Sequence, residues 1–243
     1  MKPVCEIHNL SLRLQKNNYL LYNISYEVYQ NDFIVILGLN GSGKTSMLKI
    51  LNGSIKNYSG SIKIAHQEIK KIPYSTYTNY VSTITQNIED GLFMDFSLMH
   101  NFQLYADSFR SQNNYKPFDD FLALLKSINV RLQHLLSAKA STLSGGEKQC
   151  FLLALHLFFK RNLLLLDEHT SALDPKTAKN IMCITAEQLL KQNITCIMTT
   201  HSLDDALQYG NRLISMKNGQ IIRTFNGEAK LKLTKADLLN FCY

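Results

Sequence analysis

The segment 38–45, Gly-Leu-Asn-Gly-Ser-Gly-Lys-Thr, constrains this chain more than any other part of its sequence. It follows a continuous apolar, β-branched run at 33–37 and precedes a helical pattern at 46–51, so it joins a buried strand to a helix. In that context the spacing G-x-x-x-x-G-K-[ST] is typical of a loop that holds phosphate groups. Glycines let backbone N–H groups wrap an anion, and the helix N-terminus adds partial positive charge. The sequence therefore predicts nucleotide binding.

Two side chains in this segment have separate expected roles. The ammonium group of Lys44 can reach the β- and γ-phosphates, and the hydroxyl of Thr45 can bind Mg²⁺. A glycine-rich turn without a ligand would need neither side chain. The residues expected to contact ATP here are Gly38, Leu39, Asn40, Gly41, Ser42, Gly43, Lys44, Thr45 and Ser46.

The second feature is acidic and ends the apolar run at 163–166, where Asp167 and Glu168 follow four leucines. Successive residues of a strand point to opposite faces, so the two carboxylates have different expected roles. We expect Asp167 to orient the Mg²⁺ shell and Glu168 to polarise an attacking water. The alternative is a strand that simply ends in solvent with acidic residues.

The order of the patterns predicts an α/β fold with a mostly parallel sheet. Short alternating runs in the first 30 residues indicate antiparallel strands, and buried strands at 163–166 and 194–198 each follow a helical segment. From 93 to about 137, apolar residues recur at helical spacing, which predicts an inserted helical subdomain. We expect one domain over 1–243, with a core at 1–90 and 160–243 and the helical subdomain at about 91–159.

Composition narrows the class of protein. Hydrophobic residues make up 45% and charged residues 19%, which is ordinary for a globular chain. The five cysteines have no metal-ligand spacing and are expected to be reduced thiols. No apolar stretch approaches the length of a membrane span, and the N-terminus lacks a signal-peptide core. The net charge of +7 is spread along the chain, which favours a solvated basic surface, with weak attraction to an anionic membrane as the alternative.

The segment 143–149, Leu-Ser-Gly-Gly-Glu-Lys-Gln, adds a second helix start. Ser144 and Glu147 form the S-x-x-E pattern of a capping box, which predicts a helix running to about Phe159. Two glycines in the first turn are unfavourable for a helix. They are explained if the backbone must approach a partner closely, and a helix N-terminus attracts phosphate.

With this segment the sequence resembles the nucleotide-binding subunit of ABC transporters over essentially its whole length, which implies a P-loop NTPase core of the ABC ATPase fold. The resemblance implies a head-to-tail pair of domains, with each ATP between one chain's phosphate loop and the other chain's Ser144, Gly145 and Gly146. It also implies that Gln86 touches Mg²⁺ and the membrane partner, that the segment 171–174 crosses the dimer interface, and that His201 senses the γ-phosphate. Asp174 followed by Pro175 is also an ordinary helix start.

More narrowly, the segments 167–178 and 209–213 resemble a bacterial importer subgroup for amino acids or other small organic solutes. That implies a separate transmembrane permease subunit, an extracytoplasmic solute-binding protein and a position on the cytoplasmic face of the membrane. No nucleic-acid partner is expected. Two alternatives are a soluble ABC-type ATPase acting on ribosomes or DNA, and a domain that binds nucleotide without hydrolysing it.

The sequence departs from the family pattern at a few positions. Leu14 stands where an aromatic residue commonly stacks on adenine, and either Tyr19 or Tyr22 is the candidate to replace it. His169 stands in place of a proline and Cys150 in place of an arginine. These differences affect the expected adenine contact but remove no phosphate or Mg²⁺ contact.

Overall fold

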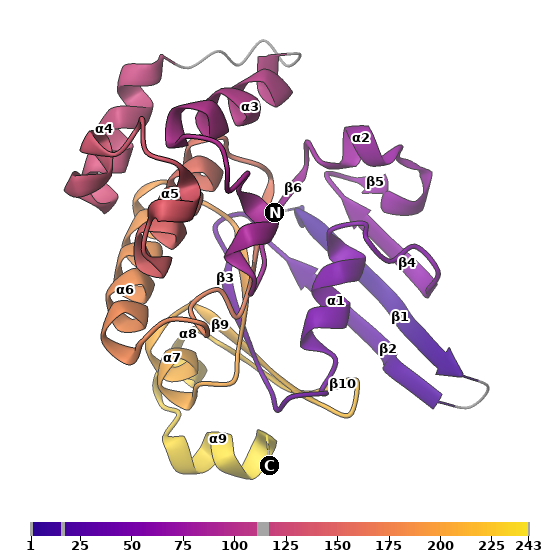
Figure 1. The fold of residues 1–243 in the computed structure, drawn as a ribbon. Coiled ribbons are helices and arrows are strands. Elements are labelled where there is room, and N and C mark those ends of the chain that lie inside the picture. The colour runs from indigo at the N-terminus through magenta and orange to yellow at the C-terminus, as the bar shows by residue number, and fades with distance from the viewer. Residues whose placement is uncertain (1, 16–17, 111–116, 243) are drawn as a thin grey trace. The chain divides into compact units, whose positions relative to one another are not determined.

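The computed structural model describes residues 2–15, 18–110 and 117–242. These residues form two compact units (Figure 1). The first contains Met1–Thr83, Arg161–Glu168 and Asn193–Tyr243, and the second contains Ile84–Lys160 and His169–Gln192.

An antiparallel sheet opens the first unit, with the strand order β2-β1-β4-β5. Strand β1 pairs in antiparallel register with both β2 and β4 (Figure 1). Alternate residues of β1, among them Cys5 and Ile7, are buried, which is the period-2 pattern of a sheet with one covered face. The strands are β1 (Cys5–Gln15), β2 (Asn18–Val28), β4 (Ser59–Ile64) and β5 (Gln67–Glu68).

A second sheet has the order β10-β9-β3-β8-β7-β6. Strand β3 pairs in parallel with β8 and β9, β7 pairs in parallel with β8, and β10 closes an antiparallel hairpin on β9. Every residue of β3, β7 and β8 is buried, which suits strands covered on both faces. The strands are β3 (Phe33–Leu37), β6 (Val81–Ile84), β7 (Leu163–Asp167), β8 (Cys196–Thr200), β9 (Arg212–Lys217) and β10 (Gln220–Asn226).

The two sheets confirm the predicted fold class, a mostly parallel sheet with an antiparallel N-terminal portion. Strand β8 differs from the predicted run at both ends, because it covers Cys196–Thr200 rather than 194–198. The register explains the shift, since Phe33 pairs with Cys196 and Leu37 pairs with Thr200. The strand therefore extends through both threonines toward the candidate site.

The helices of the first unit follow the strands. Helix α1 begins directly after the phosphate loop, and its buried apolar residues belong to a hydrophobic core that also contains residues from strands of both sheets. The helices are α1 (Lys44–Leu51), η1 (Ile69–Lys71), α2 (Tyr74–Tyr77), α7 (Leu203–Gln208), α8 (Gly227–Leu231) and α9 (Lys235–Cys242).

The second unit is helical. Helix α5 packs against α4 and α6, and a cluster of phenylalanine rings around Phe102 and Phe121 fills part of its interior. Its elements are η2 (Ile88–Gly91), α3 (Leu98–Arg110), α4 (Phe118–Ile128), η3 (Val130–His134), η4 (Ala140–Thr142), α5 (Gly145–Phe158) and α6 (Pro175–Lys191).

The compact unit that holds these helices is larger than the predicted subdomain at 91–159. It begins at Ile84 and includes His169–Gln192, because α6 packs against α5. Where the functional domain boundary lies stays a prediction. Among the described residues, no helix is both long and apolar enough to cross a bilayer.

Candidate functional site

The phosphate loop lies between β3 and α1, as the spacing predicted. Gly41 and Gly43 have φ angles of 80° and 102°, in the left-handed region that favours glycine. A Cβ on Gly38 would lie 2.5 Å from the carbonyl oxygen of Met216, so no side chain fits there. The loop therefore needs glycine for its turns and for close backbone packing.

Lys44 begins α1 and is buried, with 4% of its surface exposed. Its Nζ donates to the carbonyl oxygens of Gly38 at 2.8 Å and Leu39 at 3.2 Å, and lies 3.2 Å from Oε1 of Glu168. The chain thus supplies oxygen partners for a buried ammonium group inside its own glycine loop. A phosphate bound to the loop competes for the same group.

Asp167 ends β7 and is 8% exposed. Its Oδ1 accepts hydrogen bonds from two hydroxyls, that of Thr45 at 3.2 Å and that of Thr199 at 2.7 Å. Thr45 and Asp167 lie 122 positions apart in the sequence, and the fold brings them together. The sequence did not single out Thr199. The signal that could have found it is the pair of threonines, Thr199 and Thr200, that comes directly before His201.

Glu168 follows in a left-handed conformation, with φ of 45°. Its carboxylate lies between two nitrogen groups: Lys44 Nζ is 3.2 Å from Oε1, and the Nδ1 of His201 is 3.0 Å from Oε2. His201 is more than half exposed, whereas the side chain of Glu168 is 13% exposed. The carboxylates of Asp167 and Glu168 thus have separate partners.

Hydroxyl and carboxylate oxygens are hard ligands of the kind Mg²⁺ prefers, and Mg²⁺ commonly takes one or two carboxylates together with substrate phosphates. Thr45 and Asp167 present such oxygens beside the phosphate loop. Among the described residues no group of three or more His, Cys, Asp or Glu side chains forms a metal cluster. Because these two oxygens lie beside the phosphate loop, the site fits a metal that binds together with nucleotide.

Helix α5 of the second unit begins after Ser144, which forms the predicted capping box with Glu147. The Ser144 hydroxyl accepts from the Glu147 N–H at 3.3 Å, and the Ser144 N–H donates to the Glu147 carboxylate at 3.0 Å. That backbone hydrogen bond holds the pKa of Glu147 below its usual range, and the nearby Arg131 guanidinium lowers it further.

The two glycines of this helix start have a packing role within the chain. A Cβ on Gly146 would lie 2.7 Å from Cγ2 of Thr177, and one on Gly145 would lie 3.2 Å from Cδ2 of Leu173. The sequence indicated that the backbone at these glycines approaches a partner closely. Within the chain, that partner is the segment 173–177. In that segment Asp174 caps α6 by accepting from the Thr177 N–H at 3.1 Å.

A family model described as ABC transporter matches residues 21–171. The chain belongs to the ABC transporter family. It is 33% identical over 226 residues to a tyrosine transport ATP-binding protein of Clostridioides difficile, covering 91% of this chain and 90% of that protein. It is 32% identical over 219 residues to the energy-coupling factor transporter ATP-binding protein EcfA of Malacoplasma penetrans, covering 90% and 75%.

Solved structures agree. The chain matches cbiO1 of Clostridium perfringens, part of the ABC transporter complex cbiONQ, with a TM-score of 0.76 and 25% identity over 93% of this chain and 89% of that one. The ATP-binding cassette MJ1267 gives a TM-score of 0.79 with 23% identity over 99% of both chains, a likeness of fold. The chain is an ATP-binding, ATP-hydrolysing subunit of an ABC transporter.

His169, which replaces the family's common proline, is 2% exposed. Its Nε2 lies 3.3 Å from the hydroxyl of Thr185, a fully buried residue of α6. Burial lowers the pKa of His169 to about 4, so the imidazole is neutral near pH 7. Cys150, the other substitution noted, is buried in α5, and burial raises its thiol pKa to about 11.

Leu14, at the position expected to face adenine, is 59% exposed. Tyr19 and Tyr22 form an edge-to-face pair with ring centroids 5.0 Å apart. Arg13 donates to the Tyr19 hydroxyl at 2.9 Å, whereas the ring of Tyr22 is half exposed. The Tyr22 N–H bonds to Gly219, whose own N–H bonds to the Ser42 carbonyl oxygen in the phosphate loop. Tyr22 is therefore the more exposed of the two rings, and its backbone is linked through Gly219 to the phosphate loop.

Gln86 is exposed and belongs to the second unit, whereas Thr45 and Asp167 belong to the first. Its contact with metal stays a prediction.

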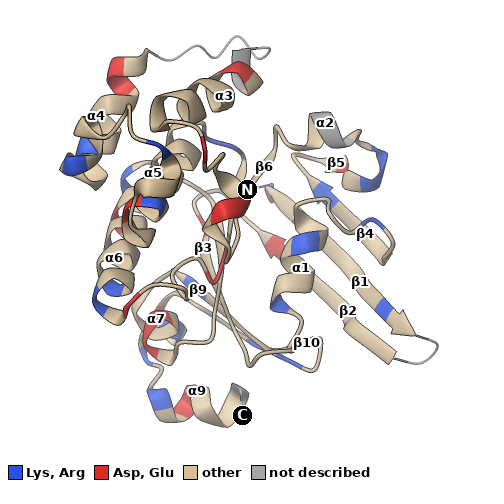
Figure 2. Ribbon diagram, in the orientation of Figure 1, with Lys and Arg blue, Asp and Glu red and all other residues tan. Residues whose placement is uncertain are grey.

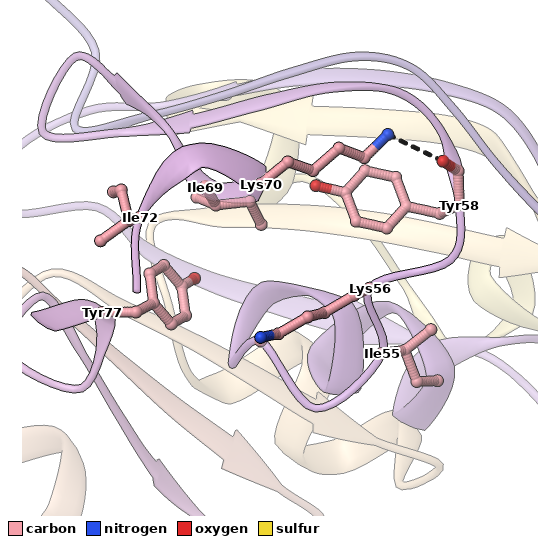
Figure 3. A pocket seen from close by; sticks show the side chains of 8 residues that line it. Ile55, Lys56, Tyr58, Ile69, Lys70, Ile72 and Tyr77 are labelled. Atoms are coloured by element: carbon pink, nitrogen blue, oxygen red, sulfur yellow. Dashed lines mark hydrogen bonds between the residues drawn. The ribbon is translucent and has the colours of Figure 1, made fainter. Parts of the chain in front are cut away.

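A pocket near the C-terminal end of α1 involves neither the phosphate loop nor the acidic strand end (Figure 3). Its Lys70 lies 4.0 Å from the centre of the Tyr58 ring and donates to the Tyr58 carbonyl oxygen at 2.8 Å, and its Tyr77 hydroxyl donates to the Leu51 carbonyl oxygen. These contacts stabilise the segment after α1.

Proposed function

We propose that this chain is the motor of a membrane importer, in which Lys44 binds the phosphates of ATP and Glu168 positions the attacking water. The observation that carries the proposal is the convergence of Lys44 and His201 on the two oxygens of one carboxylate, at 3.2 and 3.0 Å. Positioning and electrostatics provide most of the catalysis in phosphoryl transfer, and a carboxylate beside a phosphate-binding lysine fits that task.

In this mechanism the residues of the first unit act together. Backbone N–H groups at 38–46 and the Lys44 ammonium hold the phosphates, Glu168 accepts a proton from the water, and His201 orients the carboxylate. Thr45 and Asp167 would hold Mg²⁺, with Gln86 as a further proposed ligand. Bound Mg²⁺ would neutralise the charge that develops on the phosphate oxygens.

The second partner in hydrolysis is proposed to be another nucleotide-binding domain, most simply a second copy of this chain. Its Ser144, Gly145 and Gly146 would contact the nucleotide held by the first copy's phosphate loop. The support is local: these residues begin α5, and a helix N-terminus presents N–H donors and partial positive charge to an anion.

The membrane partner is proposed to be a permease subunit that docks on the second unit, which places the chain on the cytoplasmic face of the membrane. Phe93 and Phe96 are exposed by 58% and 47%, and their rings stack at 5.7 Å. Two exposed, stacked rings form an apolar contact suited to a partner helix. They lie in the segment after Gln86, where the family receives its membrane partner.

For the solute we propose a small organic molecule such as an amino acid, delivered by an extracytoplasmic solute-binding protein. The likeness to a tyrosine transport ATP-binding protein supports this class, and relatives named for phosphonate import and energy-coupling factor transport are the alternatives. No nucleic-acid partner is proposed, because Lys and Arg are distributed over many helices and strands rather than gathered on one element (Figure 2).

The test is a tagged Glu168→Gln variant. We expect it to bind ATP and to hydrolyse it about 100-fold to 10,000-fold more slowly, which is the usual contribution of a general base. Wild-type turnover in this variant would show that Glu168 lacks the proposed role. Extraction from native membranes in mild detergent with ATP should retain a stoichiometric polytopic membrane protein.

A matched control separates the docking proposal from the catalytic one. Replacing Phe93 and Phe96 by serine in the tagged variant should release the membrane protein and leave ATP binding unchanged. Recovery of ribosomes or DNA alone would instead favour the soluble-ATPase alternative.

A further inference from the structure

Thr199 is a buried residue of β8 with contacts to both acidic residues of the site. It is 1% exposed and lies directly opposite Asp167 in the parallel register of β7 and β8. Its hydroxyl oxygen is 2.7 Å from Oδ1 of Asp167 and accepts a hydrogen bond from the Glu168 backbone N–H at 3.1 Å. A single side chain thus contacts two consecutive residues with different proposed roles.

The donor and acceptor capacity of a hydroxyl determines the direction of these bonds. A threonine hydroxyl has one proton to donate and two lone pairs to accept. The Glu168 N–H uses a lone pair, and the proton has two acceptors within reach: the Asp167 carboxylate at 2.7 Å and the Leu166 carbonyl oxygen at 3.4 Å. The charged, closer acceptor wins, because hydrogen bonds to ionised groups are shorter and stronger. Thr199 therefore donates to Asp167.

The second acceptor bond of Asp167 is the weaker one. Thr45 lies 3.2 Å from the same Oδ1, and its hydroxyl is itself a proposed metal ligand. Partners behind a metal-binding carboxylate orient it and tune its affinity. Thr199, a buried residue of β8, is the hydroxyl that can keep this function while Thr45 turns to the metal.

Glu168 needs support for a different reason. A non-glycine residue with φ of 45° is in a sparsely populated region, and such conformations persist where surrounding contacts determine them. The hydrogen bond from its N–H to Thr199 is such a contact. We propose that Thr199 is a positioning residue of the nucleotide site, which orients Asp167 toward the metal and holds the backbone of Glu168. This rests on the roles proposed above for these two acids.

The test compares Thr199→Val, which keeps the shape and removes the hydroxyl, with Thr199→Ser, which restores it. Without metal or nucleotide, the Glu168 amide of Thr199→Val should exchange its hydrogen faster than in the wild type. With saturating ADP, Mn²⁺ bound at the site should broaden the amide signals of the phosphate loop. The Mn²⁺ concentration that gives half of this broadening should be about 10-fold to 100-fold higher in Thr199→Val than in the wild type. Thr199→Ser should return both measurements toward wild type.

The matched control is Thr195→Val. Thr195 is also 1% exposed and also accepts a backbone N–H, that of Asn31 at 3.1 Å, but it contacts neither acid. Thr195→Val should lower the unfolding temperature without changing the hydrogen exchange of the Glu168 amide or the response to Mn²⁺. An equal Mn²⁺ response in wild type and Thr199→Val, or equal losses in the Thr199 and Thr195 variants, would overturn the inference.

Neither readout uses hydrolysis, so failure here is distinguishable from failure of the proposed function. If Glu168→Gln keeps wild-type turnover, the role of Glu168 is wrong whatever Thr199 does. If Glu168→Gln loses turnover while Thr199→Val behaves as wild type in both measurements, only the inference about Thr199 is wrong.

Discussion

Two helix starts in this chain, those of α1 and α5, are assigned contacts with the phosphates of ATP, and they are built differently. Helix α1 has Gly43 at its N-cap, no side-chain cap, no acidic residue in its first turn, and Lys44 as its first residue. Helix α5 has a full capping box, with the Ser144 hydroxyl on an N–H of its first turn and the acidic Glu147 in that turn.

The difference shows what each start can bind. At α1 no side chain of the chain occupies the cap, and a cation stands beside it, so the loop suits phosphate by its own charge. At α5 a side chain satisfies one N–H and a carboxylate with a lowered pKa adds negative charge. The second start therefore suits an anion only when another positive group accompanies that anion, which agrees with the proposal that it meets nucleotide on a second copy.

The largest effect should come from Lys44→Ala. Removing the buried ammonium eliminates charge-assisted hydrogen bonds of about 1.5–3 kcal/mol each, so ATP affinity should fall roughly 100-fold or below detection. Calorimetric titration measures this, with Lys49→Ala, an exposed lysine of the same helix, as the control. If Lys44→Ala kept the wild-type affinity for ATP, the start of α1 would not bind phosphate through its lysine, and the proposed difference between the two helix starts would be wrong.

The next effect concerns the stability of the fold at acid pH and depends on a titrating group of the second unit. His169, in the second unit, has a pKa of about 4, whereas an unfolded histidine has about 6.5. As pH falls through 6.5 the unfolded chain takes up the proton first, so the stabilisation present above pH 6.5 is lost toward pH 4, by about 3 kcal/mol.

Denaturant unfolding across this pH range measures that loss. His169→Gln, which keeps an amide near Thr185, should flatten the dependence. Equal pH dependence in wild type and His169→Gln would rule out a buried neutral imidazole.

The smallest effect tests why α5 begins with glycines. Gly146→Ala should destabilise the fold by about 1–3 kcal/mol through overpacking against Thr177, more than the gain of up to about 1 kcal/mol in helix propensity. Thr177→Ser removes the Cγ2 methyl and should recover most of the loss in the double variant. Gly145→Ala, with a looser contact, should be milder. Failure of the rescue in thermal unfolding would mean that Gly146 is not kept for packing.

Local patterns were predictable where neighbours in sequence make the contacts. The Ser144–Glu147 capping box and the Asp174 cap with Pro175 at the first helical position are both present. Each depends on residues only a few positions apart, so its geometry follows from local chemistry.

Contacts between distant residues were not predictable in the same way. Nothing in the single sequence placed the Thr199 hydroxyl on Asp167, 32 positions away, or the His169 ring on Thr185. Both depend on which strand or helix lies alongside, and on its register. A shift of one residue in β8 would turn Thr199 away from Asp167, because side chains alternate along a strand.

The sequence by itself determined the chemistry of the candidate site: a glycine loop ending in Lys44 and Thr45, a buried strand ending in two carboxylates, and a capped helix start with two glycines. It could do so because each motif is a short, local arrangement of donors and charges. Only the tertiary structure decided which groups meet, since the parallel register brings β3, β7 and β8 together at one edge. There Glu168 lies between Lys44 and His201, and Asp167 between Thr45 and Thr199.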